Sequence, residues 1–241
     1  MPDPRGDEAI GLVEGQGVTF LHGAAGRGEV WQLQALAFPQ ARTPDFRGRK
    51  GPGTPRTVAG HVAALREVLN GAAVLVGHSL GGAVALQYAI ESASRPRGLI
   101  LVATGARLDL KREWLRRLDD DPEGVIGELV EQFFAPATSG RLKRKTLAVM
   151  RSLSPEVLRA DLQAADGFDV RDRLGGLLVP ALIICGTLDR VTPPRYSEFL
   201  HSHLPRAELT LIEEAGHMVM LEQPRAVNDA IRIFLRKLEE S

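Results

Sequence analysis

Short apolar runs alternate with longer amphipathic segments along most of the chain. The runs are rich in β-branched residues and are bounded by glycine or proline, which predicts buried β-strands. They cover residues 17–21, 73–76, 99–103, 181–185 and 209–212. The segments between them repeat apolar positions with the helical period, at residues 57–69, 80–90, 195–203 and 224–238. This alternation predicts an α/β fold with a mostly parallel, doubly wound sheet that helices cover on both faces.

The alternation stops after the third predicted strand, where helical patterns recur without a visible strand pattern. The apolar positions of this segment, which include Trp114, Phe133 and Phe134, fall at helical spacing. We expect a helical lid inserted over the carboxyl ends of the strands; the alternative is a set of ordinary helices that cover the sheet. The domains expected are a hydrolase-type core at residues 1–108 and 179–241 and a lid at residues 109–178.

The composition is that of a soluble globular protein, with 44% hydrophobic and 25% charged residues. Thirty basic residues balance thirty acidic ones, so the charge does not favour nucleic acid or an anionic membrane surface as a partner. No signal sequence or long apolar segment is visible, and we expect a cytoplasmic protein. The single cysteine, Cys185, lies in an apolar run, which predicts a buried and inert thiol.

The strongest chemical signal is GHSLGG at residues 77–82, which follows a predicted strand directly and precedes a predicted helix. This context fits a G-x-S-x-G nucleophile elbow, in which a sharp strand-to-helix turn exposes a serine hydroxyl. Side chains at Gly77 and Gly81 would clash with the strand and helix that meet there. The motif predicts Ser79 as a nucleophile; the alternative is a glycine-rich turn with a solvent-exposed serine.

A serine nucleophile needs a base, and the base needs an acid that orients it. His217 follows the last predicted strand and Asp189 follows the strand before it, so both are expected at the same sheet edge as Ser79. Other histidines are less well placed: His61 lies inside a predicted helix, His201 and His203 lie near a helix end, and His78 lies within the elbow and is expected to point away from Ser79. We expect His22 to shape its turn by hydrogen bonding, and helix capping is the role expected for the competing aspartates. These aspartates are Asp161, Asp166, Asp169 and Asp172.

The small-residue turn HGAAG, at residues 22–26, follows the first predicted strand. Backbone N–H groups of such a turn stabilise the negative charge that develops on an attacked carbonyl oxygen. We expect the amides of Leu80 and Ala24 to form the oxyanion hole, with Ala25 as the alternative to Ala24. The substrate-binding residues that we expect are Ala25, Trp114, Phe133, Phe134, Val191 and Met218.

Five motifs together resemble the α/β-hydrolase superfamily, and in particular its lidded esterase, lactonase and C–C hydrolase branch. The resemblance covers residues 17–238 and implies the α/β-hydrolase fold, with Ser79 as nucleophile, His217 as base and Asp189 as acid. These motifs are specific for fold and triad but not for substrate. They are HGAAG (22–26), DFRG (45–48), GHSLGG (77–82), GTLD with two following prolines (186–194) and AGHMVMLEQP (215–224).

Two segments depart from the family pattern. Only 21 residues precede His22, so the N-terminal hairpin strands of the family are expected to be missing or short, and residues 1–16 to be a weakly ordered lead-in. Residues 41–54 are rich in Pro, Arg and Gly where the family has a regular strand and turn. We therefore expect an irregular strand there.

These residues predict a serine hydrolase that cleaves carboxylic esters of small to medium, largely apolar substrates through an acyl-enzyme. The same triad serves lactonases, thioesterases and C–C bond hydrolases, and similar scaffolds include haloperoxidases without a cofactor. A ligand-binding receptor with vestigial activity is the other class; the intact triad and oxyanion turn disfavour it. The expected partner is an ester-like small molecule, and the sequence does not indicate an oligomeric state.

Two further expectations concern metal binding and the arginines near the start of the predicted lid. No cluster of His, Cys and carboxylate residues has metal-ligand spacing, and we expect neither a metal nor a cofactor. Four arginines near the start of the predicted lid either receive a substrate carboxylate or form a solvated helix face. They are Arg107, Arg112, Arg116 and Arg117.

Overall fold

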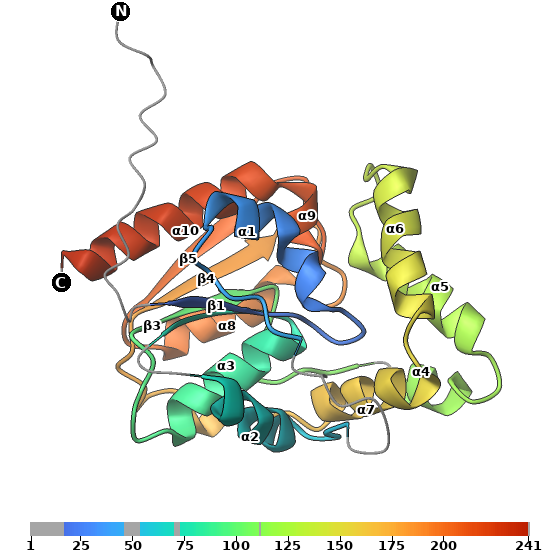
Figure 1. Cartoon of the computed structure of the whole chain (residues 1–241), viewed down its shortest axis with the longest axis horizontal. Helices are drawn as coiled ribbons and strands as arrows, with labels where there is room; N and C mark the ends of the chain where they lie inside the picture. The colour runs from blue at the N-terminus through green and yellow to red at the C-terminus, as the bar shows by residue number, and fades with distance from the viewer. Residues whose placement is uncertain (1–16, 46–53, 70–72, 111, 241) are drawn as a thin grey trace, which may run out of the picture.

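The computed structural model describes residues 17–45, 54–69, 73–110 and 112–240. These residues form one five-stranded sheet, in which every described pairing is parallel and the strands neighbour each other in chain order (Figure 1). The strands are β1 (Val18–Leu21), β2 (Val74–His78), β3 (Gly98–Val102), β4 (Ala181–Gly186) and β5 (Ala207–Ile212). Each overlaps one of the five apolar runs, so the predicted strands are confirmed.

Helices cover both faces of the sheet, as predicted (Figure 1). One face carries α1 (Gln32–Ala37), which follows the 3-10 turn η1 (Gly28–Trp31), together with α9 (Val219–Glu222) and α10 (Pro224–Glu239). The other face carries α2 (Val58–Val68), α3 (Leu80–Glu91) and α8 (Pro194–His203). The predicted helices at 57–69, 80–90, 195–203 and 224–238 are therefore confirmed.

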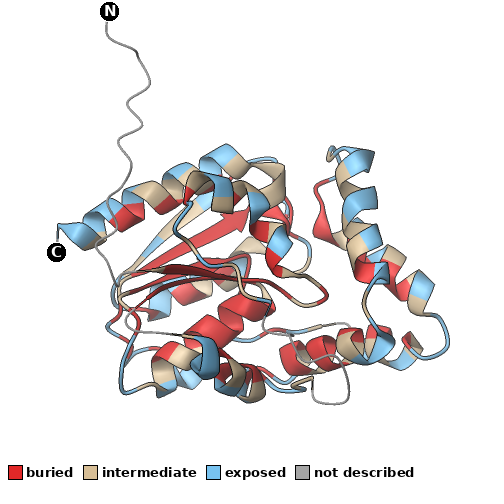
Figure 2. Cartoon of the chain, viewed as in Figure 1, coloured by how far each residue is buried: buried red, intermediate tan, exposed pale blue. Residues whose placement is uncertain are grey.

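Strand side chains alternate between two hydrophobic clusters, one on each face of the sheet. In β2, Val74 and Val76 pack in the cluster that contains Phe234 of α10, whereas Leu75 packs in the cluster that contains Leu65 of α2. Because both faces are covered, strands β1 to β4 are buried at every position. Figure 2 shows these buried strands between helices whose outer faces are exposed.

The chain reverses its direction across the sheet at β1. After α1 it pairs with one side of β1, where Phe20 N–H donates to Arg42 O and Arg42 N–H donates to Val18 O, each at 2.8 Å. It then returns through α2 to β2, on the other side of β1. In open α/β sheets, the carboxyl ends of the strands at such a reversal form a binding crevice. The turns at residues 22–26 and 77–82 both leave the sheet at this crevice.

Four helices connect β3 to β4, and the described residues of this connection contain no strand. They are α4 (Arg112–Arg117), α5 (Pro122–Phe133), α6 (Gly140–Arg151) and α7 (Pro155–Asp166), and the 3-10 turn η2 (Arg171–Arg173) follows them. Figure 1 shows α5 and α6 beyond the ends of the strands rather than over a face of the sheet. We call α4 to α7 the helical insertion; its division from the core at residues 108 and 178 stays a prediction.

Two sequence expectations fall wholly or partly outside the described residues. The lead-in and the missing hairpin concern residues 1–16, which the structure does not describe. The irregular strand expected at residues 41–54 lies partly outside the described residues, because residues 46–53 are not described. In the described part, Arg42 forms a single parallel β-bridge with Thr19 of β1. Within the described ranges, no helix is long and apolar enough to cross a membrane.

Candidate active site

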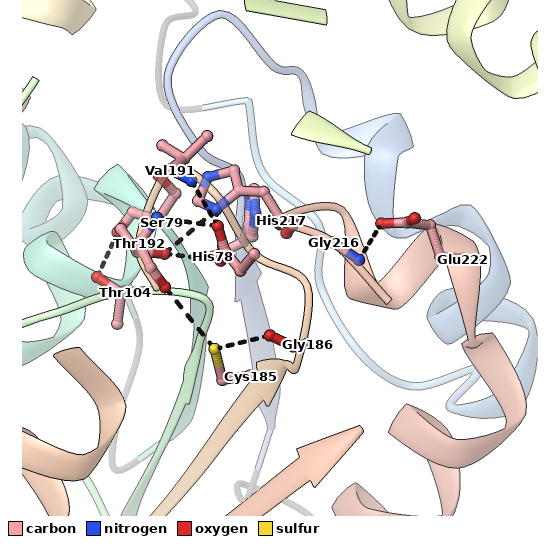
Figure 3. Close-up of polar contacts among 11 residues, drawn as sticks. His78, Ser79, Thr104, Cys185, Gly186, Val191, Thr192, Gly216, His217 and Glu222 are labelled. Carbon is pink, nitrogen blue, oxygen red and sulfur yellow. Dashed lines mark hydrogen bonds and ion pairs between the residues drawn. The ribbon is translucent and has the colours of Figure 1, made fainter. Parts of the chain in front are cut away.

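Ser79 lies at the sharp turn between β2 and α3. Its backbone φ of 52° is in the left-handed region, which a serine adopts only when surrounding contacts impose it. Two hydrogen bonds do so: Ser79 N–H donates to Val102 O at 3.0 Å, and Thr104 Oγ1 donates to Ser79 O at 2.8 Å (Figure 3). Val102 at the end of β3 and Thr104 just after it thus hold the strained turn of the predicted elbow in place.

The glycines of this turn lie where the chain leaves no space for a side chain. A Cβ added at Gly77 would lie 2.3 Å from Gly81 O, and one added at Gly81 would lie 2.4 Å from Leu21 O and 2.6 Å from His22 O. All of these obstacles are backbone atoms. The predicted clashes at Gly77 and Gly81 are therefore confirmed.

We expect Gly77→Ala to lower the free energy of unfolding by about 3 kcal/mol or more, because backbone atoms of α3 cannot move aside independently. Urea denaturation measures the change. Gly127→Ala is a matched control, since Gly127 lies inside α5 and an added Cβ meets nothing within 4 Å. The control should gain about 0.5 to 1 kcal/mol through helix propensity. Equal stability of the two variants would contradict the close approach at the elbow.

Asp189 and His217 are joined behind the pocket. Asp189 Oδ2 lies 2.9 Å from His217 Nδ1, and both side chains are almost fully buried. The same oxygen accepts from Thr192 Oγ1 at 2.8 Å, while Asp189 Oδ1 accepts from Val191 N–H at 2.8 Å and from Thr192 N–H at 2.9 Å. The carboxylate is therefore satisfied on both oxygens, and it fixes the ring of His217.

The charge state of Asp189 results from opposing influences. Burial by itself raises the pKa of the carboxyl group, but the His217 charge and the hydrogen bonds from His217 and Thr192 outweigh it. The net pKa lies below the usual value for an aspartate. Asp189 is therefore ionised at neutral pH, as an acid that orients a histidine must be.

His78 is the last residue of β2, directly before Ser79, and its side chain is buried. Burial, reinforced by the neighbouring His217, lowers the pKa of its imidazole to about 3. The neutral ring donates from Nε2 to His217 O at 3.0 Å (Figure 3). This contact supports the loop that carries His217.

The turn at residues 22–26 packs directly against the elbow. A Cβ at Gly23 would lie 3.2 Å from Ser79 Cβ, and Gly26 N–H closes the turn on Gly23 O at 3.2 Å. The His22 ring bonds to Gly23 O at 2.9 Å and to Asp45 Oδ1 at 3.1 Å, which is the structural role predicted for His22. The turn is thus held within reach of Ser79.

Two alanine amides of the turn, those of Ala24 and Ala25, were considered as oxyanion donors, and the structure distinguishes them. Ala25 N–H donates to Asp161 Oδ2 at 2.9 Å, so this amide does not face an oxyanion, and the alternative donor Ala25 is not supported. Ala24 is half-buried and lines the pocket. Leu80 is the first residue of α3, where the helix dipole favours an anion.

A pocket lies between the carboxyl edge of the sheet and the helical insertion. Ser79 and His217 line it, as do four of the predicted substrate-binding residues: Ala25, Phe133, Val191 and Met218. Most of the remaining wall is apolar and includes Leu129 of α5, Leu142, Val149 and Met150 of α6, and Leu162 of α7. Arg27, Glu29 and Lys145 add charged groups to the lining. The pocket suits an apolar substrate that has a polar end.

Trp114 and Phe134 do not line this pocket, contrary to the sequence prediction. Trp114 is buried within the insertion, where its Nε1 donates to Glu128 Oε2 at 3.1 Å. Phe134 is fully buried, and its carbonyl oxygen accepts from Arg190 at 3.1 Å. Helical spacing indicates that a side chain is buried, but it does not say whether the burial is in the core or against a ligand.

The arginines near the start of the insertion lie outside the pocket lining. Arg117 pairs with Asp121 and Glu128 at 2.7 Å each, and Arg107 lies 3.7 Å from Asp109. These contacts favour a solvated, ion-paired face. Elsewhere, the predicted burial of Cys185 is confirmed, and burial raises the pKa of its thiol to about 12.

The end of α5 is tied to the loop that carries His217. Met218 N–H donates to Phe133 O at 3.0 Å. Glu222 accepts from Gly216 N–H at 2.9 Å with one oxygen and from Ala135 N–H at 2.8 Å with the other (Figure 3 draws the first contact). The insertion therefore shares hydrogen bonds with the histidine loop, which sequence reasoning did not anticipate.

Asp161 and His61 are two buried ionisable residues outside the predicted triad. Capping was expected for Asp161, but α7 is capped by Ser154, whose side chain accepts from Val157 N–H, and that expectation is wrong. Asp161 lies inside α7 and His61 inside α2, and both are buried. The sequence signal for such a buried carboxylate is an aspartate on the apolar side of a predicted helix.

Comparisons with known proteins agree with the fold described above. The model of the alpha/beta hydrolase family matches residues 20–230. A pimeloyl-[acyl-carrier protein] methyl ester esterase of Neisseria meningitidis is 30% identical in an alignment of 226 positions that covers 85% of this chain and 83% of the relative.

Two solved structures share the fold and a similar level of identity. An esterase from Thermogutta terrifontis, solved with malate bound, has a TM-score of 0.83 at 29% identity and covers 93% of this chain and 90% of its own. Est816, an N-acyl homoserine lactone degrading enzyme, has a TM-score of 0.77 at 29% identity, with 92% and 93% covered.

Proposed function

The chain belongs to the alpha/beta hydrolase family, and from this premise we propose that it is a serine esterase for small to medium, largely apolar carboxylic esters. One observation carries the proposal: Ser79, on a strained elbow, lines the same apolar pocket as His217, whose Nδ1 is bound by the buried carboxylate of Asp189. The similarity to esterases supports the reaction class.

In the proposed mechanism, His217 takes the proton of the Ser79 hydroxyl, and Ser79 Oγ attacks the ester carbonyl carbon. The negative charge that forms on the carbonyl oxygen is stabilised by the amides of Ala24 and Leu80. His217 then protonates the departing alcohol, which leaves an acyl-enzyme. A water molecule deprotonated by His217 attacks the acyl-enzyme and releases the acid and Ser79.

We propose that the helical insertion acts as a lid that encloses the apolar part of the substrate. Leu129, Leu142 and Leu162 come from three different helices of the insertion and line one pocket. Removing an apolar acyl or alkyl chain from water contributes about 25 cal/mol per Å² of buried area. Longer unbranched chains are therefore expected to bind more tightly until the pocket is full.

A second candidate function is hydrolysis of a methyl ester on an acyl chain that a carrier protein holds. The similarity to the Neisseria enzyme and the charge of α6 favour it. Helix α6 contains no carboxylate and carries the cations Arg141, Lys143, Arg144, Lys145 and Arg151, of which Lys145 lines the pocket. Such a surface suits an anionic carrier.

A substrate panel tests the proposal. Purified protein is assayed with p-nitrophenyl esters of increasing chain length, lactones, acyl thioesters and a methyl ester on an acyl-carrier protein. We expect multiple turnovers on p-nitrophenyl esters and labelling of Ser79 by a fluorophosphonate. Faster cleavage of the carrier-linked ester than of its free counterpart would favour the second candidate. Labelling of a different residue, or a single turnover per molecule, would overturn the proposal.

A further inference from the structure

A buried carboxylate of the helical insertion contacts the turn at residues 22–26. Asp161, in the middle of α7, is 1% exposed, and its Oδ2 accepts the N–H of Ala25 at 2.9 Å. The two residues lie 136 positions apart in the sequence. The hydrogen bond therefore joins the insertion to a turn of the core that lines the pocket.

The other oxygen of this carboxylate faces a second buried ionisable group. Asp161 Oδ1 lies 3.8 Å from His61 Nε2, and His61, in α2, is 0% exposed. Charged and polar groups are costly to bury unless partners face them. Three elements that are remote in sequence, α2, α7 and the turn, thus meet at one carboxylate that the triad does not use.

The turn has a conformation that needs such support. Ala25 has a φ of 54°, in the left-handed region that residues with a Cβ rarely adopt. A hydrogen bond to its N–H sets the orientation of the peptide unit between Ala24 and Ala25. Gly23, the residue before Ala24, packs closely against Ser79. A rotation of the Ala24–Ala25 peptide unit therefore changes where the neighbouring Ala24 N–H lies relative to Ser79.

We propose that Asp161 is a positioning residue for the oxyanion site, which acts by holding the Ala25 amide, and that His61 is its second partner. This inference rests on the proposed esterase function. The carbonyl oxygen carries a full negative charge only near the transition state, so a displaced Ala24 amide lowers kcat more than it raises KM. The helical insertion then contributes to the geometry of catalysis as well as to the wall of the pocket.

Two substitutions at one position separate the hydrogen bond from the fold. Asp161→Ala removes the acceptor, whereas Asp161→Asn keeps an oxygen that can accept from Ala25. Asp166→Ala is the matched control, because it removes a carboxylate from the same helix at a residue outside the pocket lining. Each protein is assayed on a p-nitrophenyl ester, with active sites counted by fluorophosphonate titration and folding checked by urea denaturation.

For Asp161→Ala we expect kcat per titrated site to fall about 10- to 100-fold, with KM changed less than about threefold. Asp161→Asn should recover kcat to within about threefold of the wild type, and Asp166→Ala should match the wild type. In a double variant with His61→Ala, kcat should fall no further than in Asp161→Ala alone, because the two residues act as one unit.

The outcomes distinguish this inference from the function on which it rests. If the wild type cleaves no ester and its Ser79 is not labelled, the proposed function fails and the positioning role fails with it. If the wild type is an active esterase and Asp161→Ala loses stability while kcat per titrated site is unchanged, only the positioning role is overturned. An Asp161→Asn variant as slow as Asp161→Ala also overturns it, since the hydrogen bond to Ala25 would not be what matters.

Discussion

Replacement of Ser79 by alanine is expected to lower kcat/KM for a p-nitrophenyl ester by at least about 10⁴-fold, because the attacking oxygen is removed. The fold should be unaffected. Alanine retains the Cβ, and both hydrogen bonds that impose the strained backbone use main-chain atoms of residue 79: its N–H to Val102 and its carbonyl oxygen from Thr104. Steady-state kinetics measure the loss, and circular dichroism with urea denaturation verifies the fold.

Ser202→Ala is the matched control for this variant. Ser202 is exposed on α8, where its Oγ donates to Phe199 O at 3.0 Å, and it does not line the pocket. Its loss should leave kcat/KM unchanged. Fluorophosphonate should label the Ser202→Ala protein and fail to label Ser79→Ala. Full activity of Ser79→Ala, or labelling of it at another residue, would show that a different nucleophile operates.

Asp189→Asn is expected to lower kcat by about 10³- to 10⁴-fold, while the hydroxyl of Ser79 remains in place. The carboxylate accepts a hydrogen bond from His217 Nδ1–H, which leaves Nε2 free to take the proton of the serine. An amide NH₂ facing Nδ1 reverses this arrangement, because Nδ1 must then accept and Nε2 carries the proton. The loss of negative charge also removes the group that stabilises the imidazolium in the transition state.

Asp229→Asn controls for the removal of one negative charge. Asp229 forms an exposed pair with Arg232 at 2.8 Å, and such surface pairs contribute little to stability or activity. Kinetics on one ester, with folded protein quantified by denaturation, compare the two variants. If Asp189→Asn kept kcat within about tenfold of the wild type while remaining folded, a different acid would have to orient His217.

The strands, the elbow and the chain order of Ser79, Asp189 and His217 were all available from local patterns. A run such as that around β2 is apolar at every position because both of its faces are covered, and the GHSLGG motif follows it without a gap. Glycine at positions 77 and 81 indicates a close approach of backbones. The structure confirms it, because a Cβ added at either residue would lie less than 3 Å from backbone atoms. Such features depend on residues near each other in sequence, so the sequence alone indicates them.

Contacts between distant segments were not available in the same way. Phe133 and Phe134 are neighbours with the same side chain, yet one lines the pocket and the other is fully buried away from it. Trp114 fits the apolar stripe of its helix and still packs within the insertion. Periodicity reports which side of a helix is buried, but not which element buries it.

The sequence by itself determined the sheet, the covering helices, the elbow at Ser79 and the loops that carry Asp189 and His217. Only the tertiary structure decided how the helical insertion meets the core: Glu222 bonds to Ala135, and Asp161 bonds to Ala25. The physical reason is that secondary structure and turns follow from local sterics and burial, whereas a hydrogen bond across 87 or 136 residues depends on how whole elements pack. An aspartate on the apolar side of a helix indicates a buried carboxylate, but its local sequence does not say which remote amide it binds.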